Sequence, residues 1–173
     1  MAMKALLVID MLNDFIKPEG ALYIGPAAER VVPAVRARLE EYRRNGDLVI
    51  FICDRHRSGD LEFEMFPPHC LEGDPGAEVI EPLAPLPGER LIYKRRYSAF
   101  FGTELDLVLR ECQIRELELT GVVTNICVLY TAADARMLNY GVTVDAAAVA
   151  GIKEKNHRFA LQEMKDTLGV TVL

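Results

Sequence analysis

The chain has 173 residues, 50% of them apolar, and a formal net charge of −6 at pH 7. This length predicts one domain over residues 1–173 with a substantial core. The acidic balance, without a run of Lys or Arg, argues against nucleic-acid binding, and no apolar run approaches the roughly 20 residues that a helix needs to span a membrane.

The N-terminal third predicts a strand, a loop, a helix and a second strand in turn. Residues 4–10 (KALLVID) form an apolar run closed by a carboxylate, which is typical of a central parallel strand buried on both faces. After a loop at 11–25, apolar positions recur at helical spacing over residues 27–44. Residues 48–53 (LVIFIC) then form another buried strand.

Residues 54–88 are irregular and contain six Pro and four Gly. Connections of this length in a compact domain are usually functional or disordered. Beyond it the pattern predicts a strand at 91–94, an aromatic-rich loop at 97–102, a helix at 103–112, a strand at 117–122, a helix at 126–139, a strand at 142–145, a helix at 153–168 and a strand at 170–173.

This alternation of strand and helix predicts a three-layer α/β/α fold with a mainly parallel sheet. Ligands of such folds bind beyond the carboxyl ends of the strands. Asp10, Asp54, Lys94 and the turn before Cys127 all follow predicted strands. We therefore expect these residues to meet at one edge of the sheet and to form a single active site.

The first candidate site consists of Asp10, Lys94 and Cys127. Cys127 lies in the first turn of a predicted helix, where the helix dipole lowers a thiol pKa and free amides can bind an oxyanion. A neighbouring carboxylate can take the thiol proton and pass it to a leaving nitrogen, beside a cation. The alternative is a buried structural Cys, a loop-capping Asp and a surface Lys.

The other Cys residues give no sign of a disulfide framework. The four Cys, at positions 53, 70, 112 and 127, form no CxxC pair, and the N-terminus lacks a secretory signal. We therefore expect reduced thiols in a cytoplasmic protein. No Gly-rich phosphate loop is present, so no nucleotide cofactor is expected.

The second candidate site consists of Asp54, His56 and His69, with Glu62 and Glu64 between them. Two imidazoles and a carboxylate suit Zn²⁺, Fe²⁺ or Mn²⁺ with positions left open for water or substrate. The alternative is a pair of exposed loop histidines. The remaining histidine, at position 157, is expected to be exposed on the last helix.

Loop aromatics form a third group, namely Phe15, Phe66, Tyr97, Phe100 and Phe101. They flank the two candidate sites and can sandwich a flat ring. The alternative is a satellite hydrophobic cluster under the long loop.

Taken together, these motifs resemble the nicotinamidases (pyrazinamidases) of the isochorismatase-like cysteine hydrolase superfamily. The FPPH segment with an upstream D-x-H points to nicotinamidases within it. Five segments carry the resemblance in order, namely ALLVIDMLNDF (5–15), DRH (54–56), FPPHCLEGDPG (66–76), KRRYSAFFGT (94–103) and LTGVVTNICVLYTAADARMLNYG (119–141).

The resemblance implies a doubly wound sheet of six parallel strands and hydrolysis of nicotinamide to nicotinate and ammonia. By motif, Asp10 corresponds to the general base and acid, Lys94 to the triad lysine and Cys127 to the nucleophile. A non-proline cis peptide is implied between Val122 and Val123, with the amides of Val123 and Cys127 binding the oxyanion.

The same resemblance matches Asp54, His56 and His69 to metal ligands, with zinc as the first choice and iron or manganese as alternatives. Phe15 and Phe66 match the walls around the pyridine ring, and Tyr97 is added to them as a substrate contact. We expect a small-molecule amide substrate and a homo-oligomeric protein.

One departure concerns the loop after D-x-H, where some relatives carry another His and this chain reads RSGDLEFE. A fourth protein ligand is therefore Glu62 or nothing. The chain is also shorter than many relatives, so the sequence does not define which segment forms the lid over the site. Two other functions remain as alternatives: hydrolysis of another small amide or carbamoyl compound, and a non-catalytic metal or thiol sensor.

Overall fold

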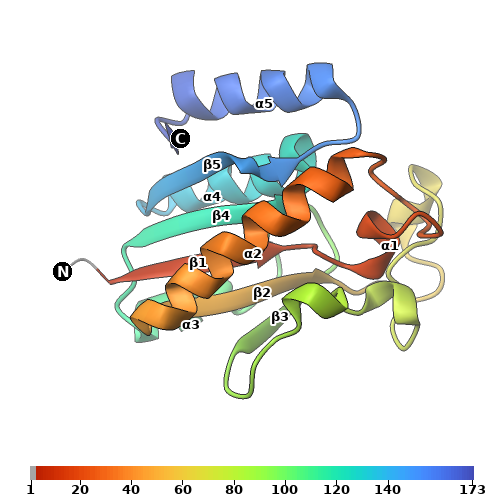
Figure 1. The fold of residues 1–173 in the computed structure, drawn as a ribbon, viewed down its shortest axis with the longest axis horizontal. Helices are drawn as coiled ribbons and strands as arrows, with labels where there is room; N and C mark the ends of the chain where they lie inside the picture. The colour runs from red at the N-terminus through yellow and green to blue at the C-terminus, as the bar shows by residue number, and fades with distance from the viewer. Residues whose placement is uncertain (1–2) are drawn as a thin grey trace.

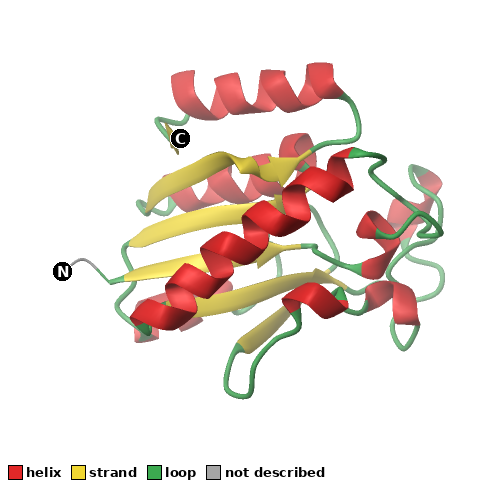
Figure 2. Ribbon diagram, in the orientation of Figure 1, coloured by secondary structure: helices red, strands yellow, loops and turns green. Residues whose placement is uncertain are grey.

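The computed structural model, which describes residues 3–173, is a six-stranded parallel sheet with helices on both faces (Figures 1 and 2). Figure 1 shows α2 crossing one face and α3 and α4 behind the other. The strands are β1 (Lys4–Ile9), β2 (Leu48–Asp54), β3 (Arg90–Lys94), β4 (Glu116–Val122), β5 (Gly141–Ala150) and β6 (Thr171–Val172). The α-helices are α1 (Asn13–Ile16), α2 (Ala27–Asn45), α3 (Leu105–Glu111), α4 (Leu129–Met137) and α5 (Glu154–Asp166). The doubly wound fold predicted from the sequence is confirmed.

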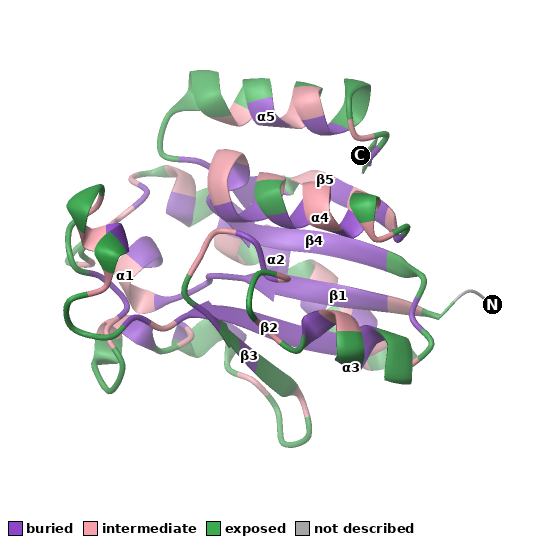
Figure 3. Ribbon diagram, turned by 180° about the vertical axis from the view of Figure 1, so that it is seen from behind, coloured by how far each residue is buried: buried purple, intermediate pink, exposed green. Residues whose placement is uncertain are grey.

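The central strands are apolar on both sides because each face packs against its own core. In β1, Ala5, Leu7 and Ile9 belong to the core beneath α3 and α4, whereas Leu6 and Val8 belong to the core beneath α2. Purple strands between mixed-colour helices in Figure 3 show the same burial. Burial on both faces is the physical reason that β1 reads as a continuous apolar run rather than an alternating one.

The strand order is β3-β2-β1-β4-β5-β6, so the chain reverses its winding direction between β1 and β4. The loops leaving these two strands diverge to opposite faces, which creates a crevice at their carboxyl ends. Asp10 follows β1 directly, and β4 leads into the segment that contains Cys127. The fold therefore places the first candidate site at the switch point.

Several local predictions differ from the structure. The loop at 11–25 contains the short helix α1, and β5 extends from the predicted 142–145 to Gly141–Ala150. The extension follows a register shift, because Leu119 pairs with Val144 but Gly121 pairs with Val149. The irregular stretch is ordered and holds three 3₁₀ helices, at Leu61–Glu64, Pro75–Ala77 and Glu81–Leu83.

Across residues 3–173, no helix is both long and apolar enough to cross a membrane.

Candidate active site

The expected convergence at one sheet edge is confirmed for the residues that follow the strands. Asp54 and Lys94 are the last residues of β2 and β3, and they pair with each other in the sheet register. Asp10 follows β1 with a φ of 51°, which turns the chain away from the sheet. All three side chains are buried, as is Cys127.

Lys94 forms the centre of this group. Its Nζ lies 2.8 Å from Oδ2 of Asp10, forms an ion pair with Asp54, and lies 3.4 Å from Sγ of Cys127. The other Asp10 oxygen accepts a hydrogen bond from the backbone N–H of Asp54 at 2.8 Å. A carboxylate oxygen of Asp10 and one of Asp54 lie within 4.8 Å of each other and of Sγ. One buried cation thus pairs with two carboxylates and contacts a thiol.

Burial and these charges set the protonation states. Burial, with the charge of Asp54, raises the pKa of Asp10 to about 6 against the opposing effect of Lys94. Burial alone would raise the pKa of Asp54, but Lys94 and the neighbouring imidazoles of His56 and His69 hold it well below its usual range. The same carboxylates raise the pKa of Lys94 above its ordinary value, although burial opposes them.

The pKa of Cys127 differs from the sequence-based expectation. Burial raises it well above its ordinary value, with Lys94 opposing and the two carboxylates adding to the rise. A helix dipole was expected to lower it, but the loss of hydration of a thiolate at this buried position is the larger effect. At neutral pH Cys127 is therefore a thiol that needs a base, and the Asp10 carboxylate lies beside it.

The turn that carries Cys127 has an unusual backbone. The Val122–Val123 peptide is cis, as the resemblance implies, and Thr124–Val128 form a short π-helix rather than the start of an α-helix. At Gly121 a Cβ would lie 1.9 Å from the carbonyl oxygen of Ile9, so a glycine is required where β4 approaches β1. Val123 and Cys127, whose amides are the expected oxyanion donors, line the same cavity.

Asp54, His56 and His69 lie together, with one ligand atom from each within 4.8 Å of the others. Nε2 of His56 lies 3.7 Å and Nε2 of His69 3.8 Å from Oδ2 of Asp54. The other ring nitrogens form hydrogen bonds on the far side of each ring. Nδ1 of His56 lies 3.1 Å from Oδ2 of Asp60, and Nδ1 of His69 lies 2.8 Å from the carbonyl oxygen of Pro67. Hydrogen bonds on the far ring nitrogen are typical of metal-binding histidines.

The donor set fits a divalent cation. Nε2 of His56 is buried without a hydrogen-bond partner, an arrangement that leaves its lone pair available to a metal. Glu62 is also buried, and its Oε2 has no hydrogen-bond partner. Glu62 lines the cavity with Asp54 and His69 but lies outside the three-residue group, so its role as a fourth ligand stays a prediction.

Three of the five loop aromatics border the site. Phe15 and Phe66 both meet His69 edge-on, at centroid distances of 5.7 and 6.3 Å, and Phe66 lies 6.4 Å from Tyr97. The apolar walls of the cavity above Cys127 are formed by Phe15, Leu22, Phe66, Tyr97, Ile126 and Ile152. The other two aromatics lie elsewhere, because Phe100 stacks on Tyr140 and Phe101 is exposed.

Helix α1 fixes the segment that carries His69, a role that sequence patterns do not reveal. Oδ2 of Asp14 accepts a hydrogen bond from the backbone N–H of Cys70 at 2.7 Å, and Nδ2 of Asn13 donates to the carbonyl oxygen of Pro75 at 2.7 Å. At Gly76 a Cβ would come within 2.3 Å of the Asp14 carboxylate. The N-D pair in the first motif therefore connects the loop after Asp10 to the metal-binding segment.

His157 was expected to be exposed, but it is half-buried. Its Nδ1 lies 2.9 Å from Oγ1 of Thr124, in the turn that carries Cys127. The sequence contained no signal for this contact, because the two residues belong to different elements and to no shared motif.

Comparison with known sequences and structures agrees with this geometry. The sequence model of the isochorismatase domain matches residues 4–173. A curated relative, the uncharacterized isochorismatase family protein PncA of Bacillus subtilis, is 39% identical over 98% of each chain. The crystal structure of nicotinamidase/pyrazinamidase PncA from Bacillus subtilis superposes with a TM-score of 0.94, at 38% identity over 99% of each chain.

Two further solved structures differ in what they act on or bind. N-carbamoylsarcosine amidase from Thermoplasma acidophilum has a TM-score of 0.91 and 37% identity, covering 99% of this chain and 95% of that one. Pyrazinamidase of Pyrococcus horikoshii in complex with zinc has a TM-score of 0.92 and 31% identity, covering 99% and 98%.

Proposed function

The chain belongs to the isochorismatase family of hydrolases, and from that membership we propose that it is a cysteine amidohydrolase converting nicotinamide to nicotinate and ammonia. The observation that supports this substrate most is the cavity over Cys127. Its walls are aromatic and aliphatic, and the charged groups that line it are the carboxylates of Asp54 and Glu62. An uncharged, flat aromatic amide suits such a cavity.

The first half of the reaction forms a thioester. Asp10, a carboxylate at neutral pH, takes the proton of the Cys127 thiol, and the thiolate attacks the carboxamide carbon. The amides of Val123 and Cys127 stabilise the negative oxygen of the tetrahedral intermediate. Asp10 then gives its proton to the departing nitrogen, which leaves as ammonia.

The second half regenerates the enzyme. Asp10 takes a proton from a water molecule, whose oxygen attacks the thioester carbon. Collapse of the second tetrahedral intermediate breaks the carbon–sulfur bond and expels the Cys127 thiolate, which takes back the proton held by Asp10. The product acid loses its own proton to solvent and leaves as nicotinate. Throughout both halves, Lys94 balances the charges of Asp10 and Asp54 and stabilises the transient thiolate 3.4 Å away.

Asp54, His56 and His69 would hold a divalent ion, for which zinc is the first choice. When bound, the ion supplies a Lewis acid that fixes the pyridine nitrogen, directly or through a water, and so orients the ring. Phe15 and Phe66, which contact His69 edge-on, would then hold the two sides of that ring.

The family resemblance also allows a carbamoyl substrate, since N-carbamoylsarcosine amidase has the same fold. Such a substrate carries a carboxylate at neutral pH. None of the residues described around the cavity is a Lys or Arg that could pair with it, and Lys94 is already paired with Asp10 and Asp54. The lack of a free cationic side chain at the cavity favours the neutral aromatic amide.

The test is ammonia release by the purified, metal-loaded protein from nicotinamide, benzamide and N-carbamoylsarcosine, with Cys127→Ala as the control. We expect nicotinamide to have the highest kcat/KM. A preference for N-carbamoylsarcosine would instead identify a carbamoyl hydrolase. No ammonia from any amide would favour a metal or thiol sensor. The homo-oligomeric state stays a prediction, which light scattering after size-exclusion chromatography checks.

A further inference from the structure

Helix α5 reaches the turn that carries Cys127. His157, in the first turn of α5, places Nδ1 2.9 Å from Oγ1 of Thr124. Thr124 is completely buried, follows Val123 directly and begins the π-helix that contains Cys127. The contact therefore connects an element late in the chain to the segment that holds the nucleophile and the proposed oxyanion donors.

The packing around this contact is close. At Gly151, which precedes α5, a Cβ would lie 3.3 Å from Cβ of His157 and 3.5 Å from Oδ1 of Asn125. Ile152, the next residue, lines the cavity above Cys127. The connection from β5 to α5 is thus built against the nucleophile turn, and the absence of a side chain at Gly151 allows that approach.

A buried hydroxyl is stabilised by a hydrogen-bond partner, and Nδ1 of His157 supplies one to Thr124. Burial lowers the pKa of His157, and nearby Arg30 and Arg158 act in the same direction against Glu154. The ring is therefore neutral at pH 7. With its proton on Nε2, its Nδ1 accepts a hydrogen bond from the Thr124 hydroxyl.

We infer that His157 and Thr124 form a positioning pair for the reaction, whose hydrogen bond holds the turn that places Sγ of Cys127 and the amide of Val123 against the substrate carbonyl. This inference rests on the proposed amide hydrolysis at Cys127. His157 does not line the cavity above Cys127, so it acts through Thr124 and not on the substrate. Small displacements of reacting groups lower rates strongly.

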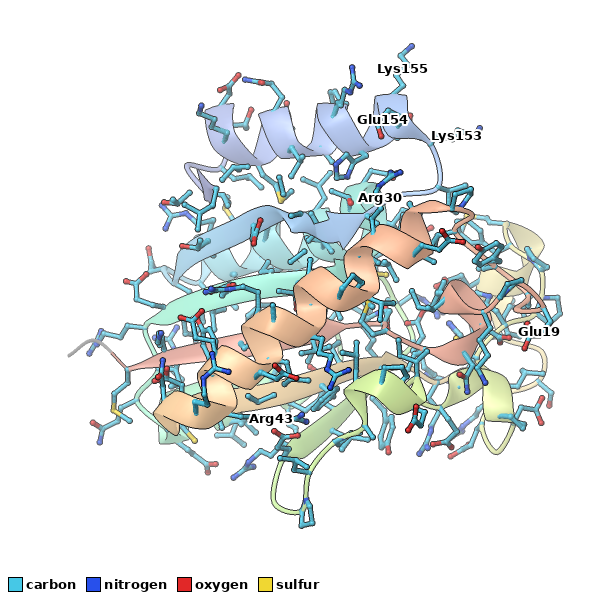
Figure 4. All side chains as sticks on the ribbon, in the orientation of Figure 1. Glu19, Arg30, Arg43, Lys153, Glu154 and Lys155 are labelled. Atoms are coloured by element: carbon cyan, nitrogen blue, oxygen red, sulfur yellow. The ribbon has the colours of Figure 1, made fainter. Side chains whose placement is uncertain are left out.

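The surroundings of His157 allow it to be replaced without an enclosed void. The residue also lines a separate cavity of about 310 Å³ between the start of α2 and the end of β5. Figure 4 shows Arg30 of α2 near Glu154 at the start of α5, two residues that border this cavity. Loss of the imidazole therefore enlarges a hollow that already exists, and His157→Ala is expected to fold.

The test compares His157→Ala, Thr124→Val and the double variant by kcat and KM for ammonia release. Each single variant should lose about tenfold in kcat, the value of one hydrogen bond, with KM within twofold of wild type. The double variant should lose no more than either single one, because both remove the same bond. Thr124→Ser and His157→Asn, which keep a hydroxyl and an acceptor, should restore most of the rate. Lys155→Ala, at an exposed position on α5, is the matched control.

A second readout does not depend on the substrate. Cys127 is buried, so release of its turn should increase its alkylation rate by iodoacetamide at least threefold, even as kcat falls. An unchanged kcat, or a double variant slower by the product of the single losses, overturns the inference. If wild type hydrolyses no amide, the proposed function fails and the alkylation rate alone decides; equal rates in wild type and His157→Ala then overturn the positioning pair.

Discussion

The ammonium nitrogen of Lys94 lies 3.4 Å from the sulfur of Cys127, and both side chains are enclosed by protein. A buried cation normally loses its proton, but Lys94 keeps it because Asp10 and Asp54 both pair with the ammonium. The pair therefore holds a positive charge where a thiolate forms during the reaction.

Replacing Lys94 with Met should affect stability and chemistry together. Two buried carboxylates would lose their counter-ion, which destabilises a protein by about 3–5 kcal/mol. The pKa of Cys127 should rise further, because Lys94 is the group that lowers it. Urea unfolding and alkylation of Cys127 as a function of pH measure the two effects. An unchanged midpoint would contradict the buried network.

Cys127→Ala should abolish ammonia release, with a loss on the order of a thousandfold or more. The fold should be kept, because the cavity left by one sulfur is small. Cys112→Ser is the control, since Cys112 is half-exposed and lies at the end of α3, away from the strand ends. Comparable losses in the two variants would contradict the nucleophile assignment.

The pKa of Asp10, raised to about 6, predicts an acid limb in the pH profile of kcat/KM. Above that pH Asp10 is a carboxylate and can take the thiol proton, whereas below it Asp10 is protonated and cannot. Activity should therefore fall about tenfold per pH unit below pH 6. Asp10→Asn should lose at least about a hundredfold and show no such limb. A wild-type rate in Asp10→Asn would mean that another group moves the proton.

His56→Ala and His69→Ala should each lower the bound metal, because two protein ligands seldom retain a cation. Elemental analysis measures this loss. If the metal orients the ring nitrogen, kcat/KM for nicotinamide should fall much more than that for benzamide, which lacks the nitrogen. Equal losses for both amides would place the metal's role at the carboxamide or in the fold instead.

Asp14→Ala should weaken the metal site without touching a ligand. It removes the acceptor for the backbone N–H of Cys70, next to His69, and loss of such supporting contacts typically lowers metal affinity 10–100-fold. Gly76→Ala should have the same effect, because its Cβ would collide with the Asp14 carboxylate. Titration of the metal-free variants with Zn²⁺ measures the affinities. Wild-type Zn²⁺ affinity in both variants would show that α1 does not support the metal site.

Much of the fold could be read from the chain because its signals are local. Continuous apolar runs predicted β1 and β2. The carboxylates at the ends of these runs identified Asp10 and Asp54 as site candidates. The extent of β5 was underestimated, since its alanine-rich second half follows a register shift that no periodicity reveals.

The sequence by itself determined the succession of strands and helices along the chain. It also determined the triad candidates and the metal-ligand candidates, because strand C-termini of a parallel sheet must meet at one edge. Only the tertiary structure decided how those groups act on one another. The raised pKa of Cys127 arises from burial by segments far apart in the chain. The contacts of Asp14 with Cys70 and of His157 with Thr124 span 56 and 33 residues, and such pairings follow from packing between elements rather than from any local pattern.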